Sequence, residues 1–115
     1  MKLGYKKIVV KVGSNVITQA NGLPDEARIN HLVNQLAEIK QQGIEVILVS
    51  SGAVAAGRSL IKVSEKHDAI TTRQLLAAIG QVKLINTYSN FFATHQIKCA
   101  QVLVTKEDFR DRAHY

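Results

Sequence analysis

Short continuous apolar runs in this chain alternate with longer stretches in which apolar residues recur every three or four positions. Residues 8–12 and 46–49 are uninterrupted except at Lys11, rich in β-branched side chains, and followed by turns that contain Gly13 and Gly52. Runs of this length and composition predict buried strands of a parallel sheet. Residues 97–104 are predicted to form a third strand.

The first helical stretch has recognisable start and stop signals. Asp25 follows a loop and is suited to cap the N-terminus of a helix, while Gly43 is suited to end it. Apolar residues recur between them at helical spacing: Ile29, Leu32, Val33, Leu36 and Ile39. The pattern predicts an amphipathic helix between the first two strands.

A second long helix is expected to open at Thr71 or Thr72. Its apolar stripe consists of Leu75, Ile79, Val82, Ile85, Tyr88 and Phe92, widened by Leu76, Leu84 and Phe91. A stripe this broad predicts deep burial. Gly80 lies in its middle, where glycine costs about 1 kcal/mol relative to alanine, so we expect another backbone to approach closely there.

The order strand, helix, strand predicts parallel neighbouring strands, with helices covering both faces of the sheet. We therefore predict an α/β fold, a three-layer sandwich with a mainly parallel sheet. Residues 105–108 have the pattern of a capping box that starts another helix, and the chain stops soon afterwards. We expect residues 1–115 to be the N-terminal portion of one domain, truncated before its end.

The composition of the chain limits the kinds of ligand and the cellular location that we expect for this protein. The formal charge of +6 is scattered along the chain, and only six aromatic residues are present, which argues against a nucleic-acid-binding surface. No apolar run is long enough to span a membrane, and the N-terminus lacks the pattern of a secretion signal. Four histidines and the single Cys99 show no metal-ligand spacing, and Cys99 is expected in a buried strand. A cytoplasmic protein is the resulting prediction.

The residues after the second strand, GAVAAGRS from Gly52 to Ser59, differ by one residue from a P-loop. Arg58 stands where a P-loop has lysine, and the four residues between the glycines favour a helix rather than a phosphate-binding loop. A P-loop-like nucleotide-binding domain remains an alternative, as do a basic nucleic-acid-binding domain and a noncatalytic regulatory fragment.

A different anion site is predicted from the two glycine turns. Gly13 and Ser14 follow one strand, and Ser51 and Gly52 follow the other. Free amides at the start of a helix attract anions, and parallel strands bring ligands to their carboxyl ends. Lys11 either discourages edge-to-edge association or reaches toward a phosphate in this crevice. Ser51 could equally cap the helix, and Ser14 could equally be a turn former.

Three segments resemble the amino-acid kinase family, and within it the branch that phosphorylates glutamate: VKVGSNVIT at 10–18, VSSGAVAAGR at 49–58 and RQLLAAIGQ at 73–81. The resemblance implies ATP-dependent phosphorylation of the γ-carboxylate of L-glutamate to glutamyl 5-phosphate, the first step of proline biosynthesis, with Mg²⁺. It assigns Lys11 as a catalytic contact to ATP phosphates.

The same resemblance assigns Gly13 and Ser14 to the ATP site and Ser51 and Gly52 to the substrate site. Members of the family are longer than this chain, and the rest of the nucleotide site and further glutamate ligands would lie beyond Tyr115. We therefore expect residues 1–115 alone to be inactive. The full-length protein is expected to be a homo-oligomer with a small-molecule substrate.

Overall fold

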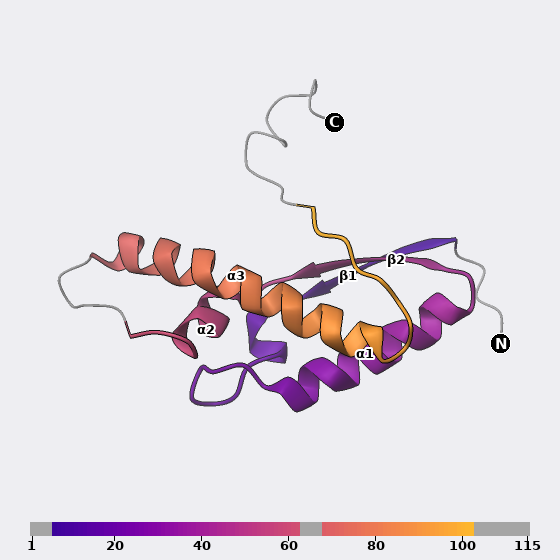
Figure 1. The fold of residues 1–115 in the computed structure, drawn as a ribbon, viewed down its shortest axis with the longest axis horizontal. Helices are drawn as coiled ribbons and strands as arrows, with labels where there is room; N and C mark the ends of the chain where they lie inside the picture. Colours follow the sequence, from indigo (N-terminus) through magenta and orange to yellow (C-terminus); the bar gives the residue numbers. More distant parts are fainter. Residues whose placement is uncertain (1–5, 63–67, 103–115) are drawn as a thin grey trace, which may run out of the picture.

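The computed structural model describes residues 6–62 and 68–102 (Figure 1). Its elements are, in order, β1 (Lys7–Val12), the 3-10 helix η1 (Ser14–Val16), α1 (Glu26–Gln41), β2 (Glu45–Ser50), α2 (Ala53–Arg58) and α3 (Ala69–Ala93). β1 and β2 are parallel neighbours, with Lys7 opposite Glu45 and Val12 opposite Ser50. The predicted α/β class and the parallel pairing of the first two strands are confirmed. None of the helices in these ranges has both the length and the apolar character needed to cross a membrane.

α1 forms where the sequence predicts it. The Asp25 side chain accepts a hydrogen bond from the Arg28 amide at 3.1 Å and so satisfies one of the free donors of the first turn. At the other end Gly43 has a φ of +86°, a conformation that favours glycine and lets the chain turn into β2. The buried face of α1 consists of Ile29, Val33, Leu36 and Ala37.

Both long helices pack on one face of the sheet. The core joins α1 and α3 to the alternate strand residues Val10, Val12, Val46 and Leu48. The other face carries Lys7, Val9, Lys11, Glu45, Ile47 and Val49, and we call it the helix-free face. Val9 on this face is 62% exposed. The described residues thus form two layers, and the expectation that helices cover both faces is wrong for this part of the chain, because α1 and α3 lie on the same side.

α3 begins a little earlier than predicted and is buried along a narrower stripe. Asp68 is its N-cap, and the buried positions recur every four residues: Leu76, Gly80, Leu84, Tyr88 and Phe92. Leu75 and Val82, which the broad stripe placed in the core, are 38% and 65% exposed. The expected deep burial is therefore wrong, since neighbouring elements in the described structure contact only one side of this helix.

The backbones of α2 and α3 touch at two glycines. A Cβ atom added to Gly80 would overlap the Ala53 carbonyl oxygen and the Gly57 amide nitrogen. A Cβ atom added to Gly57 would overlap the backbone of Leu76. The close backbone approach expected at Gly80 is confirmed, and α2 is the element that makes it.

Residues 97–102 form no strand, so the prediction of a third strand is wrong for them. The chain turns at the end of α3, where the Ile97 amide donates to the Phe92 carbonyl at 3.1 Å, and leaves without joining β1 or β2 (Figure 1). A strand requires a partner for its backbone groups, and neither strand of the described sheet supplies one here. Cys99, expected to be buried in that strand, is exposed. Residues 103 and 104 and the capping box predicted at 105–108 lie outside the described residues.

The stability of the N-terminus of α3 should depend on pH, because its N-cap is the titratable residue Asp68. The Asp68 Oδ1 atom accepts the Thr71 amide hydrogen at 2.6 Å, and hydrogen bonds from the Thr71 backbone and side chain hold the pKa of Asp68 below its ordinary value of 3.8. Because the folded-state pKa is lowered, the cap stabilises the helix above that ordinary value, and this stabilisation is lost as the pH falls through the folded-state pKa.

We therefore expect the Thr71 amide to lose protection against hydrogen exchange in strong acid, after correction for the intrinsic exchange rate. The Asp68→Asn variant should show no such loss, because its amide oxygen accepts the same bond without titrating. Identical profiles for the two proteins would contradict the assigned cap.

Candidate functional site at the carboxyl edge of the sheet

The two glycine turns begin side by side. β1 and β2 end at Val12 and Ser50, which face each other in the parallel register, and we call this end of the sheet the carboxyl edge. The Ser51 amide donates to the Val12 carbonyl at 3.0 Å and extends the pairing by one bond. Gly13 and Ser51, the first residues of the two turns, therefore directly follow adjacent strands, as the strand pattern predicts.

Several backbone amides at this edge are free to bind a ligand. After β1, the Gly13 carbonyl accepts from the Val16 amide at 3.1 Å in η1, while no residue in 6–62 or 68–102 accepts from the amides of Gly13 and Ser14. After β2, the Gly52 carbonyl accepts from Ala56, and the Gly52 and Ala53 amides have no acceptor within the same ranges. The arrangement supplies two short rows of N–H donors suited to anionic oxygens.

α2 has only six residues. A helix this short sums few peptide dipoles, so the macrodipole expected at its N-terminus adds little to the local N–H groups. The first turn of α2 should act on an anion through individual hydrogen bonds.

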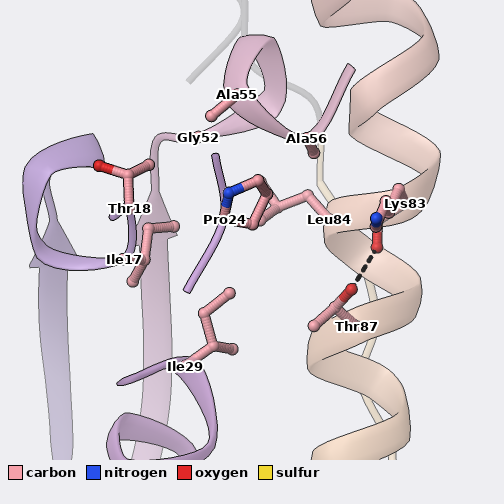
Figure 2. Close-up of a pocket in the computed structure, with 10 residues that line it drawn as sticks. All are labelled: Ile17, Thr18, Pro24, Ile29, Gly52, Ala55, Ala56, Lys83, Leu84 and Thr87. Atoms are coloured by element: carbon pink, nitrogen blue, oxygen red, sulfur yellow. Dashed lines mark hydrogen bonds between the residues drawn. The ribbon is translucent and has the colours of Figure 1, made fainter. Parts of the chain in front are cut away.

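Gly52 has a conformation and a packing that exclude a side chain. Its φ of +118° is left-handed, and a Cβ atom here would lie 2.8 Å from Cδ1 of Ile17, a fully buried residue. Figure 2 shows Gly52 beside Ile17 and Leu84 around a small apolar hollow. Its volume of about 10 Å³ holds at most one water molecule. A ligand must therefore meet Gly52 from the side of its amide and not through this hollow.

Ser51 does not cap α2. The N-cap residue is Gly52, and the Ser51 side chain makes no capping hydrogen bond to the first turn in the described structure. Ser51 is exposed next to the free amides. The interpretation of Ser51 as a helix cap is thus wrong, and Ser51 is an exposed residue at the carboxyl edge.

The Lys11 side chain leaves β1 on the helix-free face of the sheet. It lies opposite Val49 in the register, next to Val9, and no carboxylate in the described part of the chain pairs with it. Lys7 lies on the same face at the other end of β1, and its Nζ atom is 3.7 Å from Glu45 Oε2. Gly52 packs on the side of the sheet that the helices cover, whereas Lys11 is on the other side. The Lys11 ammonium can therefore reach the Gly52 turn only around the carboxyl edge, with the lysine side chain extended past Val12.

The P-loop alternative is not compatible with this geometry. The residues between Gly52 and Gly57 form α2, and Gly57 and Arg58 are its last two residues. Gly57 packs against the backbone of α3 at Leu76. A P-loop needs these amides to surround a phosphate, and here they belong to a packed helix.

One polar contact near the site was missed by sequence reasoning. The hydroxyl of Tyr88, assigned only to the apolar stripe of α3, lies 2.7 Å from Ser50 Oγ. The Ser50 hydroxyl also donates to the Ser51 carbonyl at 2.9 Å. The available signal was a tyrosine hydroxyl on a helix face predicted to be buried, because such a hydroxyl needs a hydrogen-bond partner.

Comparison with known proteins identifies relatives along nearly the whole chain. A model of the amino acid kinase family matches residues 6–115. A protein named Glutamate 5-kinase from Chlorobaculum tepidum is 55% identical over 111 residues, which are 96% of this chain and 31% of that protein. Glutamate 5-kinase from Bacteroides thetaiotaomicron is 50% identical over 115 residues, 100% of this chain and 32% of its own length. The chain spans about a third of the length of these curated relatives.

Proposed function

Because this chain belongs to the amino acid kinase family, we propose that the protein containing it is a glutamate 5-kinase. The reaction transfers the γ-phosphoryl group of ATP to the γ-carboxylate of L-glutamate and gives glutamyl 5-phosphate, the first step of proline biosynthesis. The observation that carries this proposal is the identity of 50% or more, across nearly all of this chain, to two proteins of that name. We extend the proposal to a three-layer sandwich in the complete domain, a cytoplasmic location and a homo-oligomeric state.

The chemistry requires charge neutralisation more than proton transfer. A glutamate side chain has an ordinary pKa of about 4.3, so near neutral pH it is already ionised and attacks without a general base. The main barrier is the approach of this carboxylate to the negatively charged γ-phosphoryl group, and catalysis lies in holding the two in line and offsetting their repulsion. A cation and free amides at one edge are the groups that this task needs.

We assign each predicted residue a role in that reaction. The Lys11 ammonium contacts the ATP phosphates and balances the charge that develops on the transferred group, while the free amides of Gly13 and Ser14 bind phosphate oxygens. On the neighbouring strand, the Ser51 hydroxyl and the Gly52 amide hold glutamate. The pairing of Val12 with Ser50 supports this division, because it brings the two turns together at one edge.

The described residues are not suited to hold Mg²⁺ by themselves. Within residues 6–62 and 68–102, no three His, Cys, Asp or Glu side chains come together as a possible metal site. Magnesium prefers oxygen ligands, including carboxylates and substrate phosphates. The mechanism derived from this part of the chain therefore includes no step through the metal.

A direct test is to incubate the complete protein with ATP and hydroxylamine, which traps an acyl phosphate as a hydroxamate, and to vary the acceptor. We expect hydroxamate and ADP in equal amounts with L-glutamate and far less of both with L-aspartate, whose carboxylate is one methylene nearer the backbone. ATP hydrolysis without glutamate serves as the background. Absence of hydroxamate with glutamate, or equal amounts with aspartate, would contradict the proposal.

A further inference from the structure

Tyr88 carries a polar atom on the otherwise apolar buried face of α3. The residue is 4% exposed, and its hydroxyl contacts the Ser50 hydroxyl at 2.7 Å. Ser50 is the last residue of β2 and directly precedes Ser51 and Gly52. The contact therefore connects the helical core with the turn at which we propose that glutamate binds.

The direction of this hydrogen bond follows from the number of available protons. A serine hydroxyl has one hydrogen, and that of Ser50 donates to the Ser51 carbonyl at 2.9 Å. Ser50 Oγ can then only accept from Tyr88. The bonds run from the Tyr88 hydroxyl to Ser50 Oγ and from Ser50 Oγ to the Ser51 carbonyl.

The end of this chain of bonds sets the direction of the Gly52 amide. The Ser51 carbonyl and the Gly52 N–H belong to one planar peptide unit with no cis bond, so they point in opposite directions and rotate together. Glycine at 52, with φ of +118°, puts little steric restriction of its own on that rotation. The hydrogen bond from Ser50 therefore fixes the peptide plane, and Tyr88 fixes the orientation of the Ser50 hydroxyl.

We propose that Tyr88 is a positioning residue for glutamate: acting through Ser50, it holds the Ser51–Gly52 peptide so that the Gly52 N–H points toward the bound substrate. This inference rests on the proposed function. Tyr88 itself lies in the core and makes no contact with substrate. Burial raises the pKa of Tyr88, more than the hydrogen bond with Ser50 lowers it, so the hydroxyl keeps its proton at working pH.

The test uses Tyr88→Phe, Ser50→Ala and the double variant in the complete protein, with steady-state kinetics measured separately against glutamate and ATP. We expect each single variant to raise KM for glutamate by about tenfold, the size of effect typical of one lost hydrogen bond. KM for ATP should stay within about twofold. The double variant should resemble Ser50→Ala instead of showing the product of the two effects, because both changes interrupt one path.

Thr87→Val is the matched control, since it removes a hydroxyl from the neighbouring position of α3. The Thr87 hydroxyl donates within its own helix to the Lys83 carbonyl at 2.8 Å, and we expect wild-type kinetics from this variant. Melting temperatures show whether each variant is folded.

Three outcomes would overturn the inference. Wild-type KM for glutamate in Tyr88→Phe would refute it while leaving the proposed function intact. An equal rise in both KM values with a lowered melting temperature would assign Tyr88 a structural role only. If the wild-type protein shows no turnover that depends on glutamate, the proposed function fails and this inference fails with it.

Discussion

Replacing Lys11 with alanine in the complete protein is expected to lower kcat for glutamate-dependent phosphoryl transfer by roughly 10²- to 10³-fold, a loss of about 3–4 kcal/mol of transition-state stabilisation. The Lys11 side chain starts one residue before the carboxyl edge, and no described carboxylate neutralises it. Its ammonium is therefore available to the phosphates. Because Lys11 lies on the helix-free face and outside the core, the substitution should leave the melting temperature nearly unchanged.

Lys7→Ala is the matched control. Lys7 lies on the same face of the same strand, but at the other end, in an exposed ion pair with Glu45. Exposed pairs contribute between zero and about 1 kcal/mol to stability, so Lys7→Ala should keep full activity.

Arg58→Ala should also keep most activity. An inactive Arg58→Ala together with an active Lys11→Ala would contradict our assignment and would place the phosphates at the end of α2.

Gly80→Ala should destabilise the protein by about 3 kcal/mol or more, a large part of the 5–15 kcal/mol that holds a typical domain folded. Helix propensity alone predicts the opposite sign, because alanine stabilises a helix by about 1 kcal/mol relative to glycine. Packing decides the outcome here, since the new methyl group would overlap backbone atoms of Ala53 and Gly57. Backbone atoms cannot move aside as the end of a side chain can, so α2 would have to separate from α3.

Thermal or urea denaturation of Gly80→Ala checks this result, with Asn90→Ala as the control on the exposed side of α3. The control should be neutral or slightly stabilising, as expected for an exposed helical position. Gly57→Ala, on the facing helix, should be as harmful as Gly80→Ala, because it would overlap the Leu76 backbone. Wild-type stability or better in Gly80→Ala would show that the two helices do not cross as described.

The parts of the fold that could be predicted are those determined by nearby residues. β1, α1 and β2 follow from a β-branched run, from an Asp25 cap with apolar residues at helical spacing, and from a second apolar run. Gly80 could be predicted as a close contact because glycine in a helix interior is unfavourable unless another backbone needs the space.

The errors concern contacts between distant segments. An apolar stripe shows which faces of α3 can be buried, but not which face a neighbour covers, so Leu75 and Val82 were misplaced. The sequence predicts a strand at residues 97–104, but residues 97–102 form none, because a strand needs a partner for its backbone groups. In the described residues only one sheet face is covered, and the sequence could not show this, because it depends on where each helix packs.

At the site, the sequence predicted that the turns after Val12 and Ser50 are neighbours, since parallel strands bring their carboxyl ends together. It did not predict that the Lys11 side chain reaches these turns from the helix-free face. It also missed the bond between Ser50 and Tyr88, because a buried tyrosine hydroxyl signals only that a partner is needed, and this partner lies 38 positions away.

We propose that one cation and two rows of free amides meet at the carboxyl edge around the transferred phosphoryl group. A crystal structure of the complete protein with glutamate and a nonhydrolysable ATP analogue tests it most directly. We predict that the γ-phosphate lies within hydrogen-bond distance of Lys11 Nζ and of the Gly13 amide, with the glutamate carboxylate next to the Gly52 amide. A Lys11 side chain directed along the helix-free face toward Val9, with the phosphates bound elsewhere, would contradict it.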